Sequence, residues 1–580
     1  MKRKNFLALL VSIVMIFTAF ATTACSRRNE HENEVVVKVW NYGGGVGNAW
    51  LDQETLGSAA QRFMEENKDR EFANGKKGVY VDVYADKNSP LTTLSTHEYS
   101  VFFLEGLEYV GLTKQGVALD ITDIVTGTNP YEAGKTIESK MSTDVQDALK
   151  VVNDKYYFLP HYQSYDGITY KKTLFDESNL YFAAKESDYK SSDVNSKAYG
   201  FIKNASCEKT VGPNGIKGDY DDGLPSSIDE LIRLCEYIKS KSKTPFIWFS
   251  NSNSAVSYQQ KLTNGLWAAL EGYDGTMAQF TFDSNDKETT IITGFTGTEN
   301  PDKSYASVAY TTENVKIIPE IRDANNEITQ ASNAIKLYQQ ESRYHALRFC
   351  DYLFGDPDNY HPSSVSETLQ TKIQKTFLED EVAMLIEGTY WLNEATDAGT
   401  FVSNKNLKNI ETAFMPLPVQ GTGSVTEGNG KEPVLIDSHS SFAFINANTA
   451  SKYDEYVLQM AKEFLQFCYT DESLVDFTVD SSVTRGLAYD IGDRYNELTS
   501  YAKSVWDIKS KGKTVNPISD NNIFVNNFST FTMRDTQIWI SKDVSPAGAP
   551  VRAFEKNGYS AKQYFDGLKK DTAWWNSLAR

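Results

Sequence analysis

Residues 156–175 read YYFLPHYQSYDGITYKKTLF. An apolar aromatic run ends at Pro160, rings and polar side chains fill 161–166, and a strand-like pattern resumes after Gly167. Strand-forming residues interrupted by Pro and Gly indicate a chain that leaves one packed unit and enters another. Aromatic faces beside hydrogen-bonding groups suit a flat, hydroxyl-rich ligand. We therefore expect this segment to cross between two lobes and to line the cleft between them.

The chain before this crossing alternates between strand and helix patterns. Residues 35–40 (VVVKVW), 78–85 (GVYVDVYA) and 101–104 (VFFL) have the composition of strands, and an amphipathic helix is expected after the first of them. This order predicts an α/β lobe with a largely parallel sheet. Ligands of such sheets lie beyond the carboxyl ends of the strands. The residues expected near that rim are Trp40, Tyr42 and Glu105.

The chain after the crossing predicts a second lobe. Residues 434–446 (VLIDSHSSFAFIN) predict a second crossing, back to the first lobe, and the C-terminal part is expected to cross once more and pack on the second lobe. The predicted fold class is therefore α/β, with two lobes, three hinge crossings and a cleft between the lobes. The predicted first lobe holds 35–160 and 437–500, and the predicted second lobe holds 161–436 and 501–580.

Composition excludes one broad function class. The chain has 580 residues and a formal net charge of −19. Nucleic-acid binding needs clustered Lys and Arg, so this charge disfavours it. The sequence also has no Gly-x-Ser-x-Gly, no His-Glu-x-x-His and no Cys/His pairing that would indicate a catalytic centre.

The N-terminus predicts export and a membrane anchor. Three basic residues at 2–4 precede an apolar run over 6–21, which is short for a membrane span but suits a signal peptide. The run ends in Thr22-Thr23-Ala24-Cys25, which resembles a bacterial lipobox, although Leu is usual at the first of these positions. We expect a signal peptide at 1–24, lipidation (palmitate) at Cys25 and a polar tether over 25–34. Ordinary secretory cleavage near Ala24 is the alternative.

Two further features bear on metals and disulfides. The cysteines after Cys25 are far apart and lie mostly on apolar helical patterns, which favours buried thiols over a zinc site or disulfides. An acidic, Gly-rich loop over 212–223 carries Asp219, Asp221 and Asp222, whose oxygens suit Ca²⁺. A solvated surface turn is the simpler interpretation, and no other cofactor or metal is expected.

Several stretches together resemble a known family. The lipobox is followed in order by VFFLEGLEYVGLTKQGVALDIT, LPHYQSYDGITYKKTLF, FLEDEVAMLIEGTYW, FMPLP and EFLQFCYTDESL. This series resembles the extracellular solute-binding proteins of ABC transporters, in the carbohydrate-binding family that includes maltose-binding protein. The resemblance spans most of residues 34–500. It implies a two-lobed fold with three hinge crossings and a sugar bound between the lobes.

The resemblance also implies roles for individual residues. An acidic residue at Glu105 accepts sugar hydroxyls, and the stretch Glu387-Gly388-Thr389-Tyr390-Trp391 resembles one whose Trp stacks on a sugar ring. Arg485 resembles a polar or basic residue of a late loop near the ligand. The full set of expected ligand contacts is Trp40, Tyr42, Glu105, Tyr162, Asp166, Glu387, Tyr390, Trp391 and Arg485.

The sequence thus predicts a non-enzymatic, monomeric, lipid-anchored subunit of an ABC importer on the extracellular face of the cell membrane. Its expected partners are a carbohydrate, which we expect to be an oligosaccharide, and the permease subunits of the transporter. Two alternatives stay open. One is a secreted glycoside hydrolase with paired carboxylates, and the other is a surface adhesin lipoprotein without a small ligand.

Overall fold

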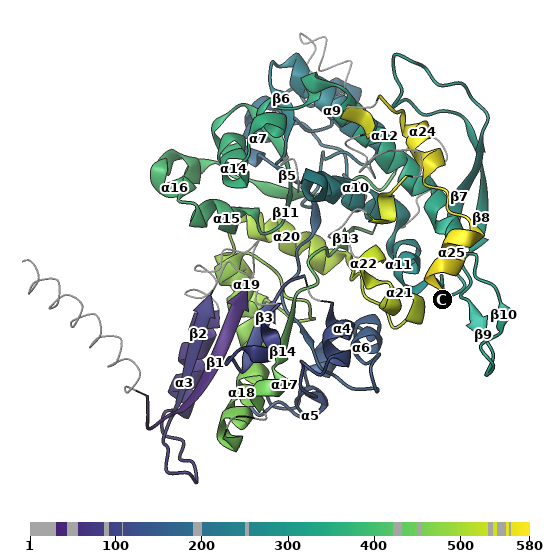
Figure 1. The fold of residues 1–580 in the computed structure, drawn as a ribbon. Helices are drawn as coiled ribbons and strands as arrows, with labels where there is room; N and C mark the ends of the chain where they lie inside the picture. The colour runs from purple at the N-terminus through teal and green to yellow at the C-terminus, as the bar shows by residue number, and fades with distance from the viewer. Residues whose placement is uncertain are drawn as a thin grey trace, which may run out of the picture.

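In the computed structural model, residues 31–579 are described apart from 43–55, 86–91, 107, 189–199, 250–254, 421–431, 451, 453, 532–536, 542–552, 556 and 557. The predicted signal peptide, Cys25 and most of the tether therefore lie outside the described residues. Figure 1 shows two groups of elements, one around β1, β2, β3 and β14 and one around β5, β6 and β11. Each group is built on its own sheet, so the predicted two-lobed α/β class is confirmed.

The first sheet has five strands in the order β2-β1-β3-β14-β4. Their bounds are β1 Val35–Tyr42, β2 Val79–Ala85, β3 Val101–Leu104, β4 Leu159–Pro160 and β14 Phe442–Ile445. β1 pairs in parallel with β2 and β3, whereas β14 runs antiparallel to β3 and β4. The predicted parallel strands are confirmed, and the returning strand β14 lies between β3 and the edge strand β4.

Helices cover this sheet with apolar faces at helical spacing. The ring of Phe63 on α3 lies 5.4 Å from that of Phe464 on α18, and both side chains are buried. The helices of this lobe are α3 Gly57–Asn67, α4 Tyr109–Lys114, α5 Thr122–Thr126, α6 Thr143–Leu149, α17 Ala447–Ala450, α18 Glu455–Cys468 and α19 Asp471–Ser481. Burial of such faces stabilises the helices more than intrinsic propensity does.

The second sheet has four strands in the order β12-β5-β11-β6. Their bounds are β5 Asp166–Tyr170, β6 Thr244–Ile247, β11 Val382–Gly388 and β12 Ala413–Met415. β11 is buried along its whole length and pairs in parallel with β6 and antiparallel with β5. A continuous apolar run is typical of such a central strand.

Helix α10 (Ala255–Glu271) packs across β5 and β11 of this sheet. A Cβ atom at Gly265 would lie 2.6 Å from the Asp166 carbonyl oxygen and 2.7 Å from Leu417 Cδ1. Only a glycine therefore allows this approach. The close packing brings the side chain of the neighbouring residue, Asn264, and that of Lys261, one turn earlier, against the start of β5.

The remaining elements surround the second sheet or extend from it. The helices are α7 Lys172–Ser178, α9 Ile228–Ser240, α11 Tyr273–Thr281, α12 Glu341–Gly355, α13 Ser363–Ser366, α14 Gln370–Glu379, α15 Trp391–Asp397, α16 Thr400–Ser403, α20 Ser500–Lys511, α21 Asn522–Asn526, α22 Phe528–Phe531, α24 Ala561–Gly567 and α25 Thr572–Leu578. The strands are β7 Glu288–Phe295, β8 Tyr310–Lys316, β9 Ile321–Arg322, β10 Ile328–Gln330, β13 Val434–Ile436 and β15 Lys513–Val515.

Part of the C-terminal region packs on α10 of the second lobe, while the ring of Phe528 lies 6.3 Å from that of Tyr109 on α4. The predicted assignment of 501–580 to the second lobe stays a prediction. Trp539 is fully buried, its ring lies 6.0 Å from that of Trp267 on α10, and its Nε1 donates to Asn264 Oδ1 at 2.8 Å. The guanidinium of the fully buried Arg343 lies 4.3 Å from the Trp267 ring centroid and 4.8 Å from that of Trp539.

Three chain segments connect the two sheets, and they are hydrogen-bonded to one another. The first, 161–165, lies in the middle: His161 N donates to Ser441 O at 2.9 Å, and Gln163 N donates to Thr484 O at 2.9 Å. The second is 437–441, and the third begins at 482 and leads from α19 to α20. Crossings at these places agree with the predicted number, while the predicted lobe boundaries themselves stay a prediction.

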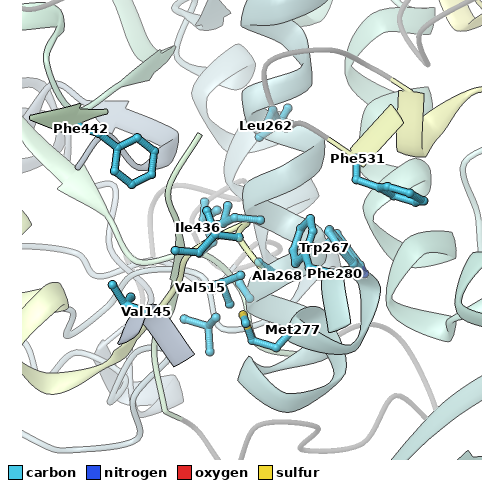
Figure 2. Packing of buried hydrophobic residues seen from close by; sticks show 14 of the residues in the cluster. Val145, Leu262, Trp267, Ala268, Met277, Phe280, Ile436, Phe442, Val515 and Phe531 are labelled. Atoms are coloured by element: carbon cyan, nitrogen blue, oxygen red, sulfur yellow. The ribbon is translucent and has the colours of Figure 1, made fainter. Parts of the chain in front are cut away.

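The apolar core is continuous beneath these crossings. Figure 2 shows buried side chains of α10 and α11 with Ile436 of β13 and Val515 of β15, and with Val145 and Phe442 of the first lobe. β13 and β15 pair in parallel over three residues, so the connection is itself a small sheet. A shared core of this kind holds the hinge region of the two lobes together.

Candidate functional site

Six buried side chains from both lobes and two crossings meet between the two sheets. This inter-sheet cluster consists of Glu105, Tyr162, Asp166, Lys261, Tyr390 and His439. Glu105 follows β3 and Asp166 begins β5, so strand ends of the two sheets face each other here. This is the position at which α/β sheets place ligands.

Glu105 joins the first lobe to both crossings. Tyr162 Oη donates a hydrogen bond to the Glu105 carboxylate, and His439 Nε2 lies 3.9 Å from Glu105 Oε2. The backbone is tied as well, since Gly106 N donates to His439 O at 2.9 Å. The His439 ring lies 4.9 Å from the Tyr390 ring at an interplanar angle of 68°, an edge-to-face arrangement. A carboxylate, two phenols and an imidazole thus lie within one small region.

Asp166 accepts hydrogen bonds from three side chains, two on α10 and one in the second crossing. Ser438 Oγ donates to it at 2.7 Å, Asn264 Nδ2 at 3.1 Å and Lys261 Nζ at 3.2 Å. The Lys261 ammonium also lies 5.3 Å from the centroid of the Tyr390 ring. A buried charge needs such partners. The arrangement places a carboxyl group and a lysine amine in contact where the two lobes meet.

Asp437 fixes the geometry of the two crossings. Its Oδ1 accepts from Ser164 N at 3.0 Å and from His439 N at 3.2 Å. Burial raises the pKa of this carboxyl to about 7. The side chain therefore sets the position of the His439 backbone relative to the first crossing.

A second pair of carboxyl groups lies on the second lobe. Gln374 Nε2 donates to Glu394 Oε2 at 2.8 Å and to Glu387 Oε1 at 3.2 Å, and Gln370 contacts the same two oxygens. Burial raises the pKa of Glu387 to about 7, and burial together with the Glu387 charge raises the pKa of Glu394 well above its ordinary value. Because two close carboxylates do not ionise together readily, this pair retains a proton at neutral pH.

The Glu387 pair is electrostatically connected to the first lobe. The pKa of Glu394 is raised mainly by burial and by the Glu387 charge. The Glu105 charge raises it further, by a smaller amount. The pKa of Tyr258 on α10 is raised mainly by burial and by the charges of Glu387 and Glu394, and the Glu105 charge adds a smaller effect in the same direction. Carboxyl groups of both lobes therefore act on one another across the inter-sheet cluster.

The two predicted tryptophans lie outside this cluster. Trp391 has no exposed surface and packs edge-on against Phe377 at 5.6 Å and Tyr501 at 5.9 Å, within a core of the second lobe. Its neighbour Tyr390 belongs to the inter-sheet cluster instead. The motif at the end of β11 predicted both residues, but α15 begins at Trp391 and directs the two side chains to different surroundings.

Trp40 packs in an aromatic group on the first sheet. Its ring lies 4.7 Å from His97, 4.9 Å from Tyr84 and 5.0 Å from Tyr99. Tyr42, two residues further along β1, is half-buried at the end of the strand. Tyr42 pairs with Leu104, directly before Glu105, and its predicted ligand contact stays a prediction.

Arg485 supports the crossings from the side of the first lobe. Its Nε donates to His161 O at 3.0 Å, and its guanidinium lies 4.8 Å from the ring centroids of both Tyr469 and Phe477. The side chain is 1 % exposed. Tyr162 and Arg485 also form an isolated β-bridge, so the backbone of Arg485 adjoins the site while its charge faces the interior.

Sequence reasoning missed several members of the site. Lys261 and Asn264 lie one turn apart on α10, and nothing in their sequence marks them as polar contacts of β5. His439 and Ser438 lie in the stretch 434–446, which was expected to cross between lobes, and their polar side chains within an otherwise apolar run were a usable signal.

The loop proposed for Ca²⁺ is held by its own hydrogen bonds. Asp221 accepts from Asn214 N at 2.8 Å, Asp222 from Gly218 N at 2.9 Å, and Asp219 from Asn214 Nδ2 at 2.9 Å. Burial raises the pKa of Asp221 to about 7. No group of three or more metal-ligating His, Cys, Asp or Glu side chains occurs among the described residues. Calcium binding here stays a prediction.

The predictions of buried thiols and of a chain without a membrane-spanning segment can be compared with the structure. Cys207, Cys235, Cys350 and Cys468 are free thiols, and all but Cys207 are buried, as their helical patterns indicated. Within the part of the chain that the structure describes, no helix has the length and apolar character needed to cross a bilayer.

Comparisons with known proteins gave matches only among solved structures. No family model matches the chain, and no curated protein matches it significantly. A family 1 extracellular solute-binding protein from Bifidobacterium longum subsp. infantis is similar at 14% identity and a TM-score of 0.46, over 94% of this chain and 100% of that one.

Two structures of RafE are similar to the same degree. The apo form from Streptococcus pneumoniae has 12% identity and a TM-score of 0.49, over 95% of this chain and 99% of that one. RafE in complex with raffinose has 12% identity and a TM-score of 0.47, over 94% of this chain and 100% of that one. Along nearly its whole length, this chain is thus similar to solved solute-binding proteins.

Proposed function

We propose that the chain is a lipid-anchored substrate-binding subunit of an ABC importer, which binds a carbohydrate of oligosaccharide length between its lobes and delivers it to a membrane permease. The observation that carries the proposal is the inter-sheet cluster: rings and charged groups from both lobes and two crossings meet where the strand ends of the two sheets face each other. Cys25 would carry the lipid and hold the protein, as a monomer, on the extracellular face of the membrane.

The chemistry of the cluster suits a sugar. A pyranose presents apolar C–H faces, which pack on flat rings such as those of Tyr162 and Tyr390. Its hydroxyls donate to carboxylates, here Glu105 and Asp166, and accept from groups such as the Lys261 ammonium. These side chains satisfy one another in the present conformation, so a bound sugar would exchange protein–protein hydrogen bonds for protein–sugar ones.

Binding between lobes also gives a way to signal occupancy. A ligand that contacts both lobes has a higher affinity for the closed conformation and shifts the population toward it. Closure removes water and strengthens the polar contacts by lowering the local dielectric. The permease would then recognise the closed form.

The direct test is calorimetry of the chain from residue 26 onward with a panel of oligosaccharides that includes raffinose. We expect saturable binding of one sugar per chain, weakened at least tenfold by Tyr162→Phe combined with Glu105→Gln. The control is Tyr495→Phe. The Tyr495 hydroxyl donates a hydrogen bond to Asp507, in the chain that leads from the first lobe to the second. A panel without any binding, or a double variant that binds as tightly as the parent, would refute the assignment.

A glycoside hydrolase is the second candidate, and the raised pKa of Glu387 is the observation that favours it. A carboxyl that holds a proton near pH 7 is suited to act as a general acid. The proposal that the chain is not an enzyme predicts unchanged oligosaccharides after prolonged incubation, as seen by chromatography. Release of shorter sugars that is abolished by Glu387→Gln would establish the hydrolase.

The anchor is tested separately. Cells that express the full chain should incorporate labelled palmitate and retain the protein in the membrane fraction, and Cys25→Ala should remove both properties. If Cys25→Ala protein that has lost its signal peptide still remained in the membrane fraction, this would contradict the assigned anchor.

A further inference from the structure

A cavity lies at the crossings, and none of the six residues of the inter-sheet cluster lines it. We call this cavity the hinge pocket. Its volume is about 440 Å³, within the range of about 300–1,000 Å³ typical of small-molecule sites. Its walls come from three places: α20 and β15, the third crossing, and the first lobe next to α6. The lining residues used below are Lys140, Gln163, Tyr489, Trp506, Lys509 and Thr514.

The charge of this hinge pocket is opposite to that of the chain. The lining includes two lysines and, among the described residues, no Asp or Glu, although the whole chain carries −19. The Lys140 charge is compensated, since its Nζ lies 2.8 Å from Asp471 Oδ1 and also contacts Glu132. The positive character of the pocket therefore comes from Lys509.

The Lys509 ammonium is hydrogen-bonded to backbone carbonyl oxygens rather than to carboxylates. Its Nζ donates to Arg485 O at 2.8 Å and to Leu487 O at 3.3 Å, and no carboxylate pairs with it in the described part of the chain. An ammonium has three N–H donors, so one is left for a further acceptor. Burial, with the nearby Arg485 charge, lowers the pKa of Lys509 to about 7, which agrees with a lack of compensating negative charge.

Two aromatic rings form a wall beside this ammonium. The Tyr489 and Trp506 rings lie 5.2 Å apart and are tilted by 58°. Lys509 Nζ lies 4.6 Å from the centroid of the first ring and 5.5 Å from that of the second. An apolar or ring-shaped body would pack on these faces while an anionic group approaches the ammonium.

We propose that the hinge pocket binds a small organic anion, with its carboxylate or phosphate group on Lys509 and its apolar body against Tyr489 and Trp506. Gln163 of the middle crossing and Thr514 of β15 also line the pocket. No feature of this site depends on whether the inter-sheet cluster binds a sugar.

The position of the pocket gives the anion a regulatory effect. Lys509 lies on α20, which packs on β12 of the second sheet, whereas Lys140 belongs to the first lobe and Gln163 to the middle crossing. An anion in the pocket contacts all three and favours the lobe arrangement in which they are spaced as here. Hydrogen exchange of the backbone over 484–489 should therefore slow when the anion binds.

The test uses two anionic probes, phenylacetate and phenyl phosphate, and the neutral 2-phenylethanol, each titrated into the chain from residue 26 onward. We expect at least one anion to bind saturably and to slow exchange over 484–489, and the neutral probe to bind at least tenfold more weakly. Whichever anion binds tighter identifies the preferred headgroup. Failure of both anions to bind at millimolar concentration would overturn the proposal.

Variants locate the binding. Lys509→Gln should weaken the anion at least tenfold, whereas Lys503→Gln on the same helix, outside the pocket lining, should leave it unchanged. Ser510→Trp, which fills the pocket but keeps Lys509, should also abolish binding. This variant decides the matter if Lys509→Gln does not fold. Anion binding that persists in folded Lys509→Gln or Ser510→Trp protein would place the anion elsewhere and reject the site.

Discussion

At position 391 the indole has no exposed surface and lies between the rings of Phe377 and Tyr501. Its replacement would leave a large cavity rather than an empty ligand platform. We expect Trp391→Ala to lower the free energy of unfolding by about 3–5 kcal/mol, as large-to-small changes of buried aromatic residues do. Urea denaturation measures this change. Trp574→Ala, at a half-exposed indole, should lower it by much less.

A loss of sugar affinity without a loss of stability would instead assign Trp391 to the ligand site. A Trp391→Ala protein that unfolds at the same urea concentration as the parent, but binds oligosaccharide more than tenfold more weakly, would mean that the indole stacks on sugar rather than filling a core.

The carboxyl pair of Glu387 and Glu394 gives stability a dependence on pH. Both pKa values are raised in the folded chain, so the folded state holds protons that the unfolded state has lost. The resulting stabilisation is present below the ordinary pKa of a glutamate and is lost as pH rises through about 7. Each unit of pKa difference corresponds to about 1.4 kcal/mol.

We therefore expect a higher melting temperature at pH 5.5 than at pH 8, with Asp437 contributing in the same direction. Glu394→Gln keeps an acceptor for Gln374 and removes the charge, so it should raise the melting temperature at pH 8 and flatten the profile between these values. Glu66→Gln, at an exposed position, should leave the profile unchanged. A Glu394→Gln profile as steep as that of the parent would contradict the shared proton.

At the scale of elements, the approach of α10 to β5 decides which polar groups meet. In an exposed helix interior Gly→Ala stabilises by up to about 1 kcal/mol. At Gly265 the added Cβ would lie 2.6 Å from a backbone carbonyl, so we expect Gly265→Ala to destabilise the protein instead.

The matched helical glycine is Gly111 on α4. Its added Cβ would meet only the Glu108 side chain, at 3.3 Å, and this side chain is able to move. Gly111→Ala should therefore be neutral or stabilising in the same thermal melts. Because Lys261 and Asn264 depend on the close packing, Gly265→Ala should also weaken sugar binding, and equal effects of the two substitutions would refute the explanation.

Element types and crossings were predictable because they follow from local patterns. The alternating run at 79–85 and the buried run at 382–388 became strands, and Ser227 caps α9 by accepting from Glu230 N at 3.2 Å. The sequence of residues 333–354 (NAIKLYQQESRYHALRFCDYLF) has the apolar spacing of one amphipathic helix, and this prediction is wrong in one respect. The segment is divided at Gln340, whose side chain bonds Trp267 Nε1 and Gly275 O instead of continuing a helix surface.

Side-chain neighbours were less predictable, because they depend on contacts between distant segments. Asp166 was expected in the site from its place in the crossing, but its partners come from 95 and 272 positions away along the chain. Adjacent residues also diverge: Tyr390 contacts the inter-sheet cluster and Trp391 enters the core. Composition marks both as suitable ligand contacts, and only packing separates them.

At the scale of the whole molecule, the two sheets define lobes that share a continuous core at the crossings and a buried polar cluster between strand ends. If ligand favours closure, an oligosaccharide that binds should reduce the radius of gyration measured by X-ray scattering in solution. The Tyr162→Phe, Glu105→Gln double variant should show no reduction at the same sugar concentration. An unchanged radius at saturation of the parent protein would contradict ligand-driven closure.

The three connecting segments are bonded side by side, with Ser438 N donating to Ser164 O at 3.1 Å and Gly486 N donating to His161 O at 3.0 Å. Segments joined in this way bend together. We therefore expect a rotation of one lobe relative to the other to take place about a single axis through the three hydrogen-bonded segments. Twisting or sliding in any other direction would break several of these bonds at once. We therefore expect any opening of the lobes to follow one trajectory, so that the side chains between them meet again in the same register.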